Sequence, residues 1–360
     1  MVRHLYLHIP FCHHICPYCA FYKHTPGRLA NRAFVDAILT EAEIRAADYD
    51  FELETIYFGG GTPSLLSKSH LDRLCSGLVR IFQTDAVSEW TIEANPATFG
   101  VKKAALMRQL GINRASLGVQ SFQNETLKML GRDHSPDDAI SAYEDLREAG
   151  FENIGVDQMF SIPGQTAEMW ASDLAKVCEL KPEHISCYNL TYEEDTDFLQ
   201  RHESGELDDD DDRNADFFYQ AIDHLEGAGF QHYEISNYAR PGLRSKHNQA
   251  YWRGADYLGL GPGAVSTIAG KRWKTIPDTA AYVTTADTRT EHEDLSEEDL
   301  RLEAIALRLR TSKGVPTGLL PRPNPVRSLI QQGLVEEKDG HVFLTREGKA
   351  LADPVTGMLV

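Results

Sequence analysis

Apolar and polar positions follow two alternating periods along the first half of the chain. Short runs rich in branched and aromatic residues predict buried strands, and the longer stretches between them carry apolar residues at the spacing of amphipathic helices. The predicted strands cover residues 5–8, 55–58, 90–93, 115–119, 154–159 and 185–190, and the predicted helices cover residues 32–46, 70–82, 102–109, 137–149 and 168–179. Six such units predict an α/β fold with a parallel sheet, either doubly wound or curved into an incomplete barrel.

Local signals support several helix ends. Ser135 followed by Pro136 suits the N-cap and first turn of a helix, and Gly111 and Gly150 predict the ends of the helices that precede them.

The alternation of predicted strands and helices stops after residue 251. Ser296-Glu-Glu-Asp299 is a capping box that predicts a helix as far as Arg310. A second helix is expected around residues 325–332, and Asp339-Gly340 predicts a two-residue hairpin between residues 334–338 and 341–345. We therefore expect three parts: residues 1–235 as the sheet domain, 236–290 as a connecting segment, and 291–360 as a small winged-helix-like α+β module.

Composition limits the class of protein. The 360 residues are 42% hydrophobic, which is enough for one large core and a smaller module, and no run reaches the length of a membrane span. The net charge is −18, and eleven acidic residues against one Arg lie between residues 193 and 212. Such a surface argues against nucleic acid as a partner. The run of five Asp at 208–212 is interpreted as a solvated loop, because consecutive carboxylates do not face one point.

Three cysteines follow the first predicted strand with the spacing C-x3-C-x2-C. Cys12, Cys16 and Cys19 can supply three thiolates from one loop to a 4Fe-4S cluster and leave its fourth iron without a protein ligand. Chemistry is then expected at that open iron. The other cysteines, Cys75, Cys178 and Cys187, lie in apolar or helical contexts and are interpreted as buried small hydrophobic residues.

Two alternatives compete for the cysteine loop. A structural zinc site is one, with His8, His13 or His14 as the fourth ligand, and a disulfide is the other. No apolar stretch of secretory-signal length precedes the cysteines. We therefore expect a cytoplasmic protein, and in a reducing compartment clustered cysteines indicate metal or redox work more often than crosslinks.

Polar residues and glycines gather where the predicted strands end. Carboxyl ends of parallel strands meet at one face, so these residues are expected to share one site. They are Cys12 after the first strand, the Gly59-Gly60-Gly61-Thr62-Pro63 turn after the second, Glu93 and Asn95 at the third, Gln120 at the fourth and Asp157 near the end of the fifth. The glycine turn lacks the Lys of a P-loop, and its bare backbone is suited to lie against an amino or carboxylate group.

Several motifs in order carry a family resemblance: the cysteine loop with Tyr6 before it, Gly-Gly-Gly-Thr-Pro, Ile-Glu-Ala-Asn-Pro, Leu-Gly-Val-Gln-Ser-Phe and Pro-Gly-Gln-Thr. Together they resemble the radical S-adenosylmethionine proteins of the oxygen-independent coproporphyrinogen III oxidase-like family. The resemblance implies an incomplete parallel (β/α)6 barrel, a 4Fe-4S cluster on Cys12, Cys16 and Cys19, and S-adenosylmethionine on the open iron. Its candidate contacts to S-adenosylmethionine are Tyr6, Tyr18, Gly60, Gly61, Thr62, Glu93, Gln120, Arg132 and Asp157.

The family has an oxidase branch and a heme chaperone branch. The oxidases carry a fourth cysteine and a longer N-terminal extension, whereas this chain has Phe21 at that position and five residues before Tyr6. His247-Asn-Gln-Ala-Tyr251-Trp252 resembles the H-N-x-x-Y-W signature of the chaperone branch. The resemblance implies heme as cargo, with His247 as an axial ligand candidate and Tyr251 and Trp252 as stacking partners. It also implies heme-acceptor proteins and a reductant such as flavodoxin or ferredoxin, and leaves open whether the chain is a homodimer.

Three positions depart from the family pattern. Val265 stands where relatives often have His, Ala20 replaces a frequent Asp and Ser161 a frequent Gly. The C-terminal module resembles that of the family and is expected to cover the barrel mouth rather than bind DNA. The favoured interpretation is a heme chaperone. The alternatives are an oxygen-independent coproporphyrinogen III oxidase, which decarboxylates its substrate through a 5′-deoxyadenosyl radical, and a zinc-stabilised binding protein.

Overall fold

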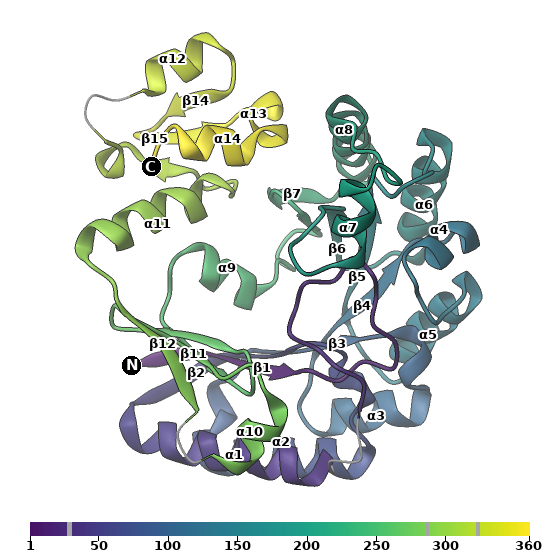
Figure 1. Ribbon diagram of the computed structural model, residues 1–360, viewed down its shortest axis with the longest axis vertical. Coiled ribbons are helices and arrows are strands. Elements are labelled where there is room, and N and C mark those ends of the chain that lie inside the picture. Colours follow the sequence, from purple (N-terminus) through teal and green to yellow (C-terminus); the bar gives the residue numbers. More distant parts are fainter. Residues whose placement is uncertain (27–30, 286–287, 322–324) are drawn as a thin grey trace.

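The parallel sheet expected from the repeating pattern is the centre of the structure. The computed structural model describes residues 1–26, 31–285, 288–321 and 325–360 (Figure 1). Six parallel strands follow one another in sequence order along the sheet. They are β1 (Val2–Ile9), β2 (Phe51–Gly60), β3 (Glu89–Ala94), β4 (Arg114–Gln120), β5 (Asn153–Phe160) and β6 (His184–Asn189). All six expected strands are confirmed, and the sheet stays open, as an incomplete barrel requires.

Helices cover the outer side of these strands (Figure 1). The five expected helices are confirmed within about two residues at each end, and they are α1 (Asn31–Asp48), α2 (Lys68–Phe82), α3 (Val101–Gln109), α5 (Pro136–Glu148) and α6 (Ala167–Leu180). Ser135 caps α5 by accepting a hydrogen bond from the Asp138 amide, and Gly111 and Gly150 follow α3 and α5 with φ of 97° and 86°. These ends form where Ser and Gly were expected because each supplies the local bond or dihedral that a helix end needs.

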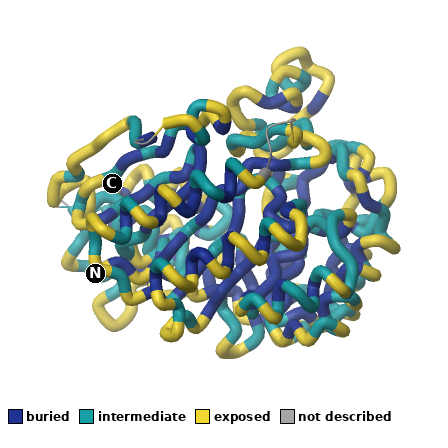
Figure 2. Tube along the Cα trace, turned by 90° about the horizontal axis from the view of Figure 1, so that it is seen from below, coloured by how far each residue is buried: buried dark blue, intermediate teal, exposed yellow. Residues whose placement is uncertain are grey.

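Alternate residues of each strand face different surroundings. On β1, Leu5, Leu7 and Ile9 are fully buried and belong to the main hydrophobic core. The polar residues between them turn to the inside of the barrel, where His4 bonds Thr55 and Tyr6 stacks on the Tyr57 ring. Figure 2 shows the buried trace filling the middle of the molecule. The period of two along a strand therefore gives the barrel an apolar outer layer and a polar interior.

Both edges of the sheet carry further strands. Next to β1 lies β9 (Tyr257–Leu260), which is parallel to it, followed by the antiparallel strands β10 (Val265–Ile268), β11 (Lys271–Thr275) and β12 (Arg289–Asp294). Next to β6 lie β8 (Asn237–Ala239) and β7 (Gln231–Glu234), both in antiparallel pairs. Residues 236–290 thus extend the main sheet at both edges, and they also form α9 (Lys246–Trp252) and α10 (Thr279–Thr284). The division into three parts stays a prediction.

Three helices of the barrel were not expected: α4 (Asn124–Met129), α7 (Asp197–Glu203) and α8 (Asp211–Gly227). The last corrects part of the interpretation of the Asp run as a loop, because residues 208–210 precede the helix whereas the final two residues of the run are helical. Asp210 caps α8 by accepting from the Arg213 amide, and Asp211 and Asp212 lie in its first turn. Carboxylates are favourable there because the helix dipole is positive at its N-terminus.

The C-terminal module has its own hydrophobic core and a three-stranded antiparallel sheet. Its elements are α11 (Glu297–Leu309), β13 (Val315–Pro316), α12 (Val326–Gln331), β14 (Val335–Lys338), β15 (His341–Leu344), α13 (Arg346–Ala350) and α14 (Ala352–Gly357). The Ser296 capping box is confirmed. So is the hairpin, whose turn residues Asp339 and Gly340 have φ of 51° and 72° as a type I′ turn demands.

The module packs at the end of the barrel opposite the cysteine loop. The Ser312 amide donates to the Tyr233 carbonyl at 2.9 Å, and the Tyr233 hydroxyl lies 2.8 Å from Nε2 of His184, the first residue of β6. Arg346 also pairs with Asp223 of α8. The expected cover over the barrel mouth is therefore wrong, because these contacts anchor the module near the amino ends of the strands. None of the helices in the described part of the chain has the length and apolar composition to cross a bilayer.

Candidate functional site

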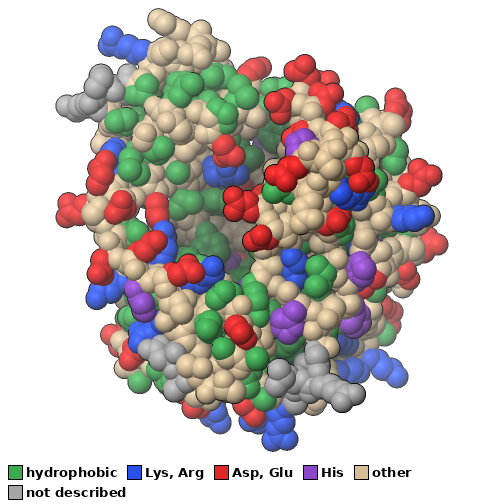
Figure 3. Space-filling view, in the orientation of Figure 1, with side chains coloured by type: hydrophobic (Ala, Val, Ile, Leu, Met, Phe, Trp, Pro, Cys, Tyr) green, Lys and Arg blue, Asp and Glu red, His purple; other side chains and the backbone are tan. Residues whose placement is uncertain are grey.

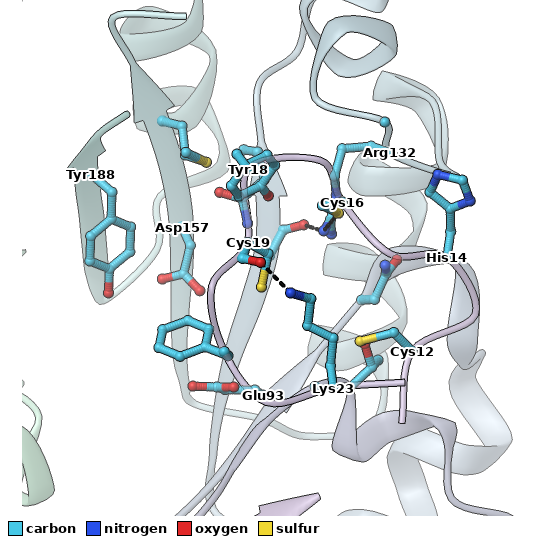
Figure 4. A pocket seen from close by; sticks show the side chains of 18 of the residues that line it. Cys12, His14, Cys16, Tyr18, Cys19, Lys23, Glu93, Arg132, Asp157 and Tyr188 are labelled. Carbon is cyan, nitrogen blue, oxygen red and sulfur yellow. Dashed lines mark hydrogen bonds between the residues drawn. The ribbon is translucent and has the colours of Figure 1, made fainter. Parts of the chain in front are cut away.

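A cavity of about 610 Å³ opens at the carboxyl ends of the parallel strands (Figure 4). The three cysteines of the loop line it together with eight of the nine residues expected to contact S-adenosylmethionine. Those eight are Tyr18, Gly60, Gly61, Thr62, Glu93, Gln120, Arg132 and Asp157. The ninth, Tyr6, lines a different cavity. The expected convergence at one face is confirmed.

The glycine turn after β2 holds the cysteine loop in place. The Gly61 amide donates to the Ile9 carbonyl at 2.8 Å, and the Thr62 amide donates to the Phe11 carbonyl at 2.7 Å. A Cβ on Gly61 would lie 2.7 Å from the Pro10 carbonyl carbon, and one on Gly60, whose φ is 107°, would lie 2.7 Å from the His8 ring. The bare backbone therefore serves close packing of the loop against β2 as well as lining the cavity.

Each cysteine of the loop has a different polar neighbour. The Thr62 hydroxyl lies 3.7 Å from Cys12 Sγ, and Arg132 Nη1 lies 3.5 Å from Cys16 Sγ. Lys23 donates to the Cys19 carbonyl, and its ammonium lies between Cys12 and Cys19 (Figure 4). Burial raises the pKa of the Cys12 and Cys19 thiols, while the Thr62 hydroxyl and the Lys23 charge act in the opposite direction. These donors are suited to stabilise thiolates.

The zinc and cluster hypotheses require different arrangements of the thiols. Among the described side chains, no three from His, Cys, Asp and Glu converge so that they could hold one metal ion. Zinc needs its ligands around one point, whereas each iron of a 4Fe-4S cluster takes its own thiolate. Of the histidines considered for zinc, His13 and His14 line the cavity, and both ring nitrogens of His8 are already engaged by the Tyr22 carbonyl and the Tyr6 hydroxyl.

Two buried carboxyl groups face the cavity from β3 and β5. Glu93 accepts from the Tyr57 hydroxyl at 2.8 Å and from the Gly60 amide at 3.2 Å, and burial raises its pKa to about 7. Asp157 accepts from the Ser116 hydroxyl, and burial raises its pKa as well. Carboxyl oxygens in these positions suit a ligand that brings an ammonium group or hydroxyl donors.

Arg132 supplies the opposite charge on the same wall. Its Nη2 donates to the Gly118 carbonyl at 2.8 Å, while its Nε is buried and has no hydrogen-bond partner in the structure. A guanidinium that lines a cavity suits a carboxylate ligand. The carboxyl pair, the Arg132 guanidinium and the three thiols together suit the amino group, carboxylate and cluster that S-adenosylmethionine binding requires.

Other residues of the cavity carried no recognisable motif. They include Lys23, Ser116, Met159, Tyr188, Asn189 and Thr191. Ser116, Met159 and Tyr188 lie in strands β4, β5 and β6, so their positions in predicted strands were the only available signal. Lys23 is four residues beyond Cys19, and its place beside the cysteine loop was the signal for it.

The three heme candidates lie on α9 and face different ways. His247 is 1% exposed, its Nδ1 lies 2.7 Å from the Thr55 hydroxyl and its ring stacks on Tyr57 at 5.1 Å. Its Nε2 is buried without a partner, and burial lowers its pKa to about 3. Trp252 lies under Arg310 of the C-terminal module, whereas Tyr251 lines a second cavity together with Tyr6. Their role in heme binding stays a prediction.

Known proteins resemble this chain over most of its length. Residues 6–177 match the model of the radical SAM superfamily, and residues 295–351 match that of the HemN C-terminal domain. The heme chaperone HemW of Lactococcus lactis is 39% identical over 86% of this chain and 82% of that protein. The heme chaperone HemW of Bacillus subtilis is 33% identical over 99% of this chain and 98% of that protein. The solved structure of coproporphyrinogen III oxidase (HemN) from Escherichia coli superposes with a TM-score of 0.84 and 23% identity, covering 99% of this chain and 89% of that chain, which shows a shared fold.

Proposed function

The chain belongs to the heme chaperone HemW family of radical S-adenosylmethionine proteins, and from this premise we propose that it binds heme and delivers it to acceptor proteins. In this role it carries a 4Fe-4S cluster on Cys12, Cys16 and Cys19 together with S-adenosylmethionine. The observation that supports the cluster most directly is the single cavity in which these three cysteines meet eight residues matched to cofactor contacts.

Different residues of the cavity would bind different groups of S-adenosylmethionine. Glu93 and Asp157 would accept from its ammonium and ribose hydroxyls, and the guanidinium of Arg132, which lines the cavity, would bind its carboxylate. When bound, the cluster and S-adenosylmethionine supply one-electron chemistry at the open iron. The glycine turn fixes the cysteine loop, so that the thiols and the Arg132 guanidinium keep a constant spacing.

A coproporphyrinogen III oxidase is the second candidate. It shares the fold, but the similarity to the solved oxidase is 23%, well below the identity to the two chaperones. Phe21 also stands where the oxidases are expected to carry a fourth cysteine, and its side chain is 68% exposed beside the cluster loop. Both observations favour the chaperone.

The proposed function implies partners. Heme is the cargo, and acceptor proteins receive it. A reductant such as flavodoxin or ferredoxin would supply electrons to the cluster. A homodimer is a further arrangement that the proposal allows. We also propose a cytoplasmic location, because a loop with three free thiols keeps its cluster-binding form in a reducing compartment.

One sample can test the proposal against the second candidate. The protein is reconstituted anaerobically with iron and sulfide, titrated with hemin, and assayed with coproporphyrinogen III, S-adenosylmethionine and a reductant. We expect saturable heme binding and no decarboxylation. Decarboxylation without heme binding would make the oxidase the correct function.

A further inference from the structure

The last residue of β4 has an unusual backbone conformation. Gln120 has a φ of 70°, in the left-handed region that residues other than Gly rarely adopt. It lines the cavity that contains the three thiols, which we call the cluster cavity, and it is one of the candidate contacts to S-adenosylmethionine. Such a conformation persists only where the surrounding structure holds it, and it is found most often at functional sites.

We propose that Asp173, a residue of α6 outside the cluster cavity, is a positioning residue that holds Gln120 in this conformation and thereby sets the affinity for S-adenosylmethionine. The proposal rests on the proposed role of the cluster cavity in binding that cofactor. It goes further by assigning a part to a carboxylate that does not line the cavity and belongs to none of the sequence motifs.

Asp173 binds the three residues that follow Gln120. Its Oδ2 accepts from the Ser121 hydroxyl at 2.6 Å, and its Oδ1 accepts from the Phe122 amide at 2.9 Å. The Gln123 side chain also donates to Oδ1, at 3.1 Å, and the Gln123 amide donates to the Ser121 hydroxyl at 3.0 Å. Both oxygens of one carboxylate therefore fix the turn directly after Gln120.

The chain before Gln120 is fixed as well. The Arg132 guanidinium donates to the Gly118 carbonyl at 2.8 Å, and His134 Nε2 donates to the Val119 carbonyl at 3.0 Å. Side chains from outside β4 thus hold the backbone on both sides of Gln120. Its φ cannot relax unless one of these contacts is lost.

The local geometry directs the Gln120 side chain into the cluster cavity. The pairing of β4 with β5 shifts by one residue between Gly118 and Gln120, and a bulge of this kind changes the direction of a side chain. A Cβ on Gly118 would lie 3.1 Å from Nε2 of Gln120 and 3.5 Å from Nη2 of Arg132. The Gln120 amide therefore lies over Gly118 and beside the guanidinium, where it can bind the same ligand.

The burial of Asp173 shows that its hydrogen bonds serve this turn. Figure 3 shows Asp and Glu side chains spread over one face of the molecule, where water solvates them. Asp173 is instead 0% exposed, and burial raises the pKa of its carboxyl group, while the Ser121 and Phe122 donors act in the opposite direction. A buried carboxylate needs several donors, and among the described residues all donors to this one lie in residues 121–123.

A double-mutant cycle separates positioning from a general loss of stability. In the reconstituted protein, we expect Asp173→Ala to raise the Kd for S-adenosylmethionine about tenfold by calorimetry, with the iron content of the wild type. In a Gln120→Ala background the same change should raise the Kd less than about twofold, because Asp173 acts through Gln120. Glu183→Ala is the matched control and should leave the Kd unchanged. Glu183 also accepts from a backbone amide, that of Ile154, and from Arg147, but it does not line the cluster cavity.

The backbone conformation can be tested without a ligand. Gln120→Gly and Gln120→Ala both lack the amide side chain, but only Gly adopts a φ of 70° freely, so Gln120→Gly should unfold at the higher urea concentration. Ser161, with a φ of 62° directly after β5 and outside the cluster cavity, is the control. Ser161→Gly should also unfold at higher urea than Ser161→Ala, and both should keep the wild-type Kd. A Gln120→Ala variant at least as stable as Gln120→Gly would contradict the strained conformation.

A second variant covers the case in which Asp173→Ala does not fold. Asp173→Asn keeps the shape and one acceptor oxygen, and it should raise the Kd about threefold. A wild-type Kd in whichever variant folds, or the same increase in both backgrounds, would overturn the positioning role and leave the cofactor site in place. Wild-type protein that binds no S-adenosylmethionine would instead overturn the proposed role of the cavity.

Discussion

At the scale of single residues, the six cysteines differ in their surroundings. Cys12, Cys16 and Cys19 line the cavity, whereas Cys75 and Cys187 are buried in the core and Cys178 is half-buried on α6. In the sequence, only the spacing of the cysteines distinguishes the two groups. A cluster needs several thiolates from one loop, whereas a core position needs only a small apolar side chain.

Replacing Cys12, Cys16 or Cys19 by Ser should abolish the iron-sulfur absorbance of the reconstituted protein, because each change removes one of only three protein ligands. Cys75→Ser, Cys178→Ser and Cys187→Ser are the matched controls and should keep it. Protein that holds stoichiometric zinc and no iron after anaerobic purification would refute the cluster.

Glu93→Ala and Asp157→Ala should weaken S-adenosylmethionine binding by at least about tenfold, because each removes a buried carboxyl group from the cavity wall. Calorimetry measures the affinity, and iron analysis of the same samples should give the wild-type content. Normal affinity in both variants, or iron lost with the cofactor, would contradict these roles.

The residues that sequence reasoning missed share a physical cause. Lys23 acts through the Cys19 carbonyl and its charge, and Ser116 through Asp157, so both depend on where the chain folds back. Tyr6, which was also expected among the cofactor contacts, lines the second cavity, beside α9, and its hydroxyl bonds His8; its contact to the cofactor stays a prediction. A motif match gives the neighbourhood of a residue, while the side on which it lies follows from tertiary packing.

At the scale of elements, strong periodicity made the six strands and five outer helices predictable. Most of the elements that were missed are short, such as β9 to β12 and α9, whereas the long helix α8 was missed because the Asp residues of its first turn were interpreted as a loop. α9 is seven residues long and its stability comes from neighbours: the Glu89 carboxylate of β3 accepts from the amides of Lys246 and His247 at 2.9 Å. No local pattern signals such a long-range cap.

Glu89→Ala should therefore destabilise α9, because three donors lose their buried acceptor: the two amides and the Ser245 hydroxyl. We expect a loss of about 1–3 kcal/mol in the free energy of unfolding, measured by urea denaturation, together with weaker heme binding. Glu54→Ala, which removes an exposed partner of Arg3, is the control and should cost less than about 1 kcal/mol. If the heme affinity of Glu89→Ala is unchanged, α9 does not contribute to heme binding.

The junction of barrel and C-terminal module contains a carboxyl group that should make stability depend on pH. Burial raises the pKa of Glu234 to about 7, and the neighbouring Ile235 amide donates to the Arg310 carbonyl of the module. The folded state thus holds this proton more tightly than the unfolded state. Its contribution to stability is complete below about pH 4 and is lost as pH rises through about 7.

Glu234→Gln should remove this part of the pH dependence. Between about pH 5 and pH 8, the free energy of unfolding of the wild type should fall more than that of the variant, by up to about 3 kcal/mol. Urea denaturation at several pH values measures the difference. Glu226→Gln, at an exposed position of α8 nearby, is the control and should show the same pH dependence of the free energy of unfolding as the wild type. If Glu234→Gln also shows the wild-type pH dependence, Glu234 is not the group responsible for it.

At the scale of the whole molecule, the open barrel joins two cavities around one loop. Residues 10–25 supply the three thiols to the first cavity, and Phe21 and Tyr22 to the second. The C-terminal module lies at the other end of the barrel, on β7, α8 and α9, which leaves the cluster cavity lined by residues 12–193 only among those described. Its position was wrongly expected because composition carries no information about which end of a barrel a module contacts.

The most direct test of heme binding beside a cluster is a hemin titration of anaerobically reconstituted protein, with wild type and His247→Ala compared side by side. The Soret and iron-sulfur absorbances are read from the same sample. For the wild type, we predict a Soret band that saturates at one heme per chain while the iron-sulfur absorbance persists. For His247→Ala, we predict weaker binding or a shifted Soret band with the cluster retained. A wild type without saturable Soret absorbance, or a cluster lost as heme binds, would contradict the account.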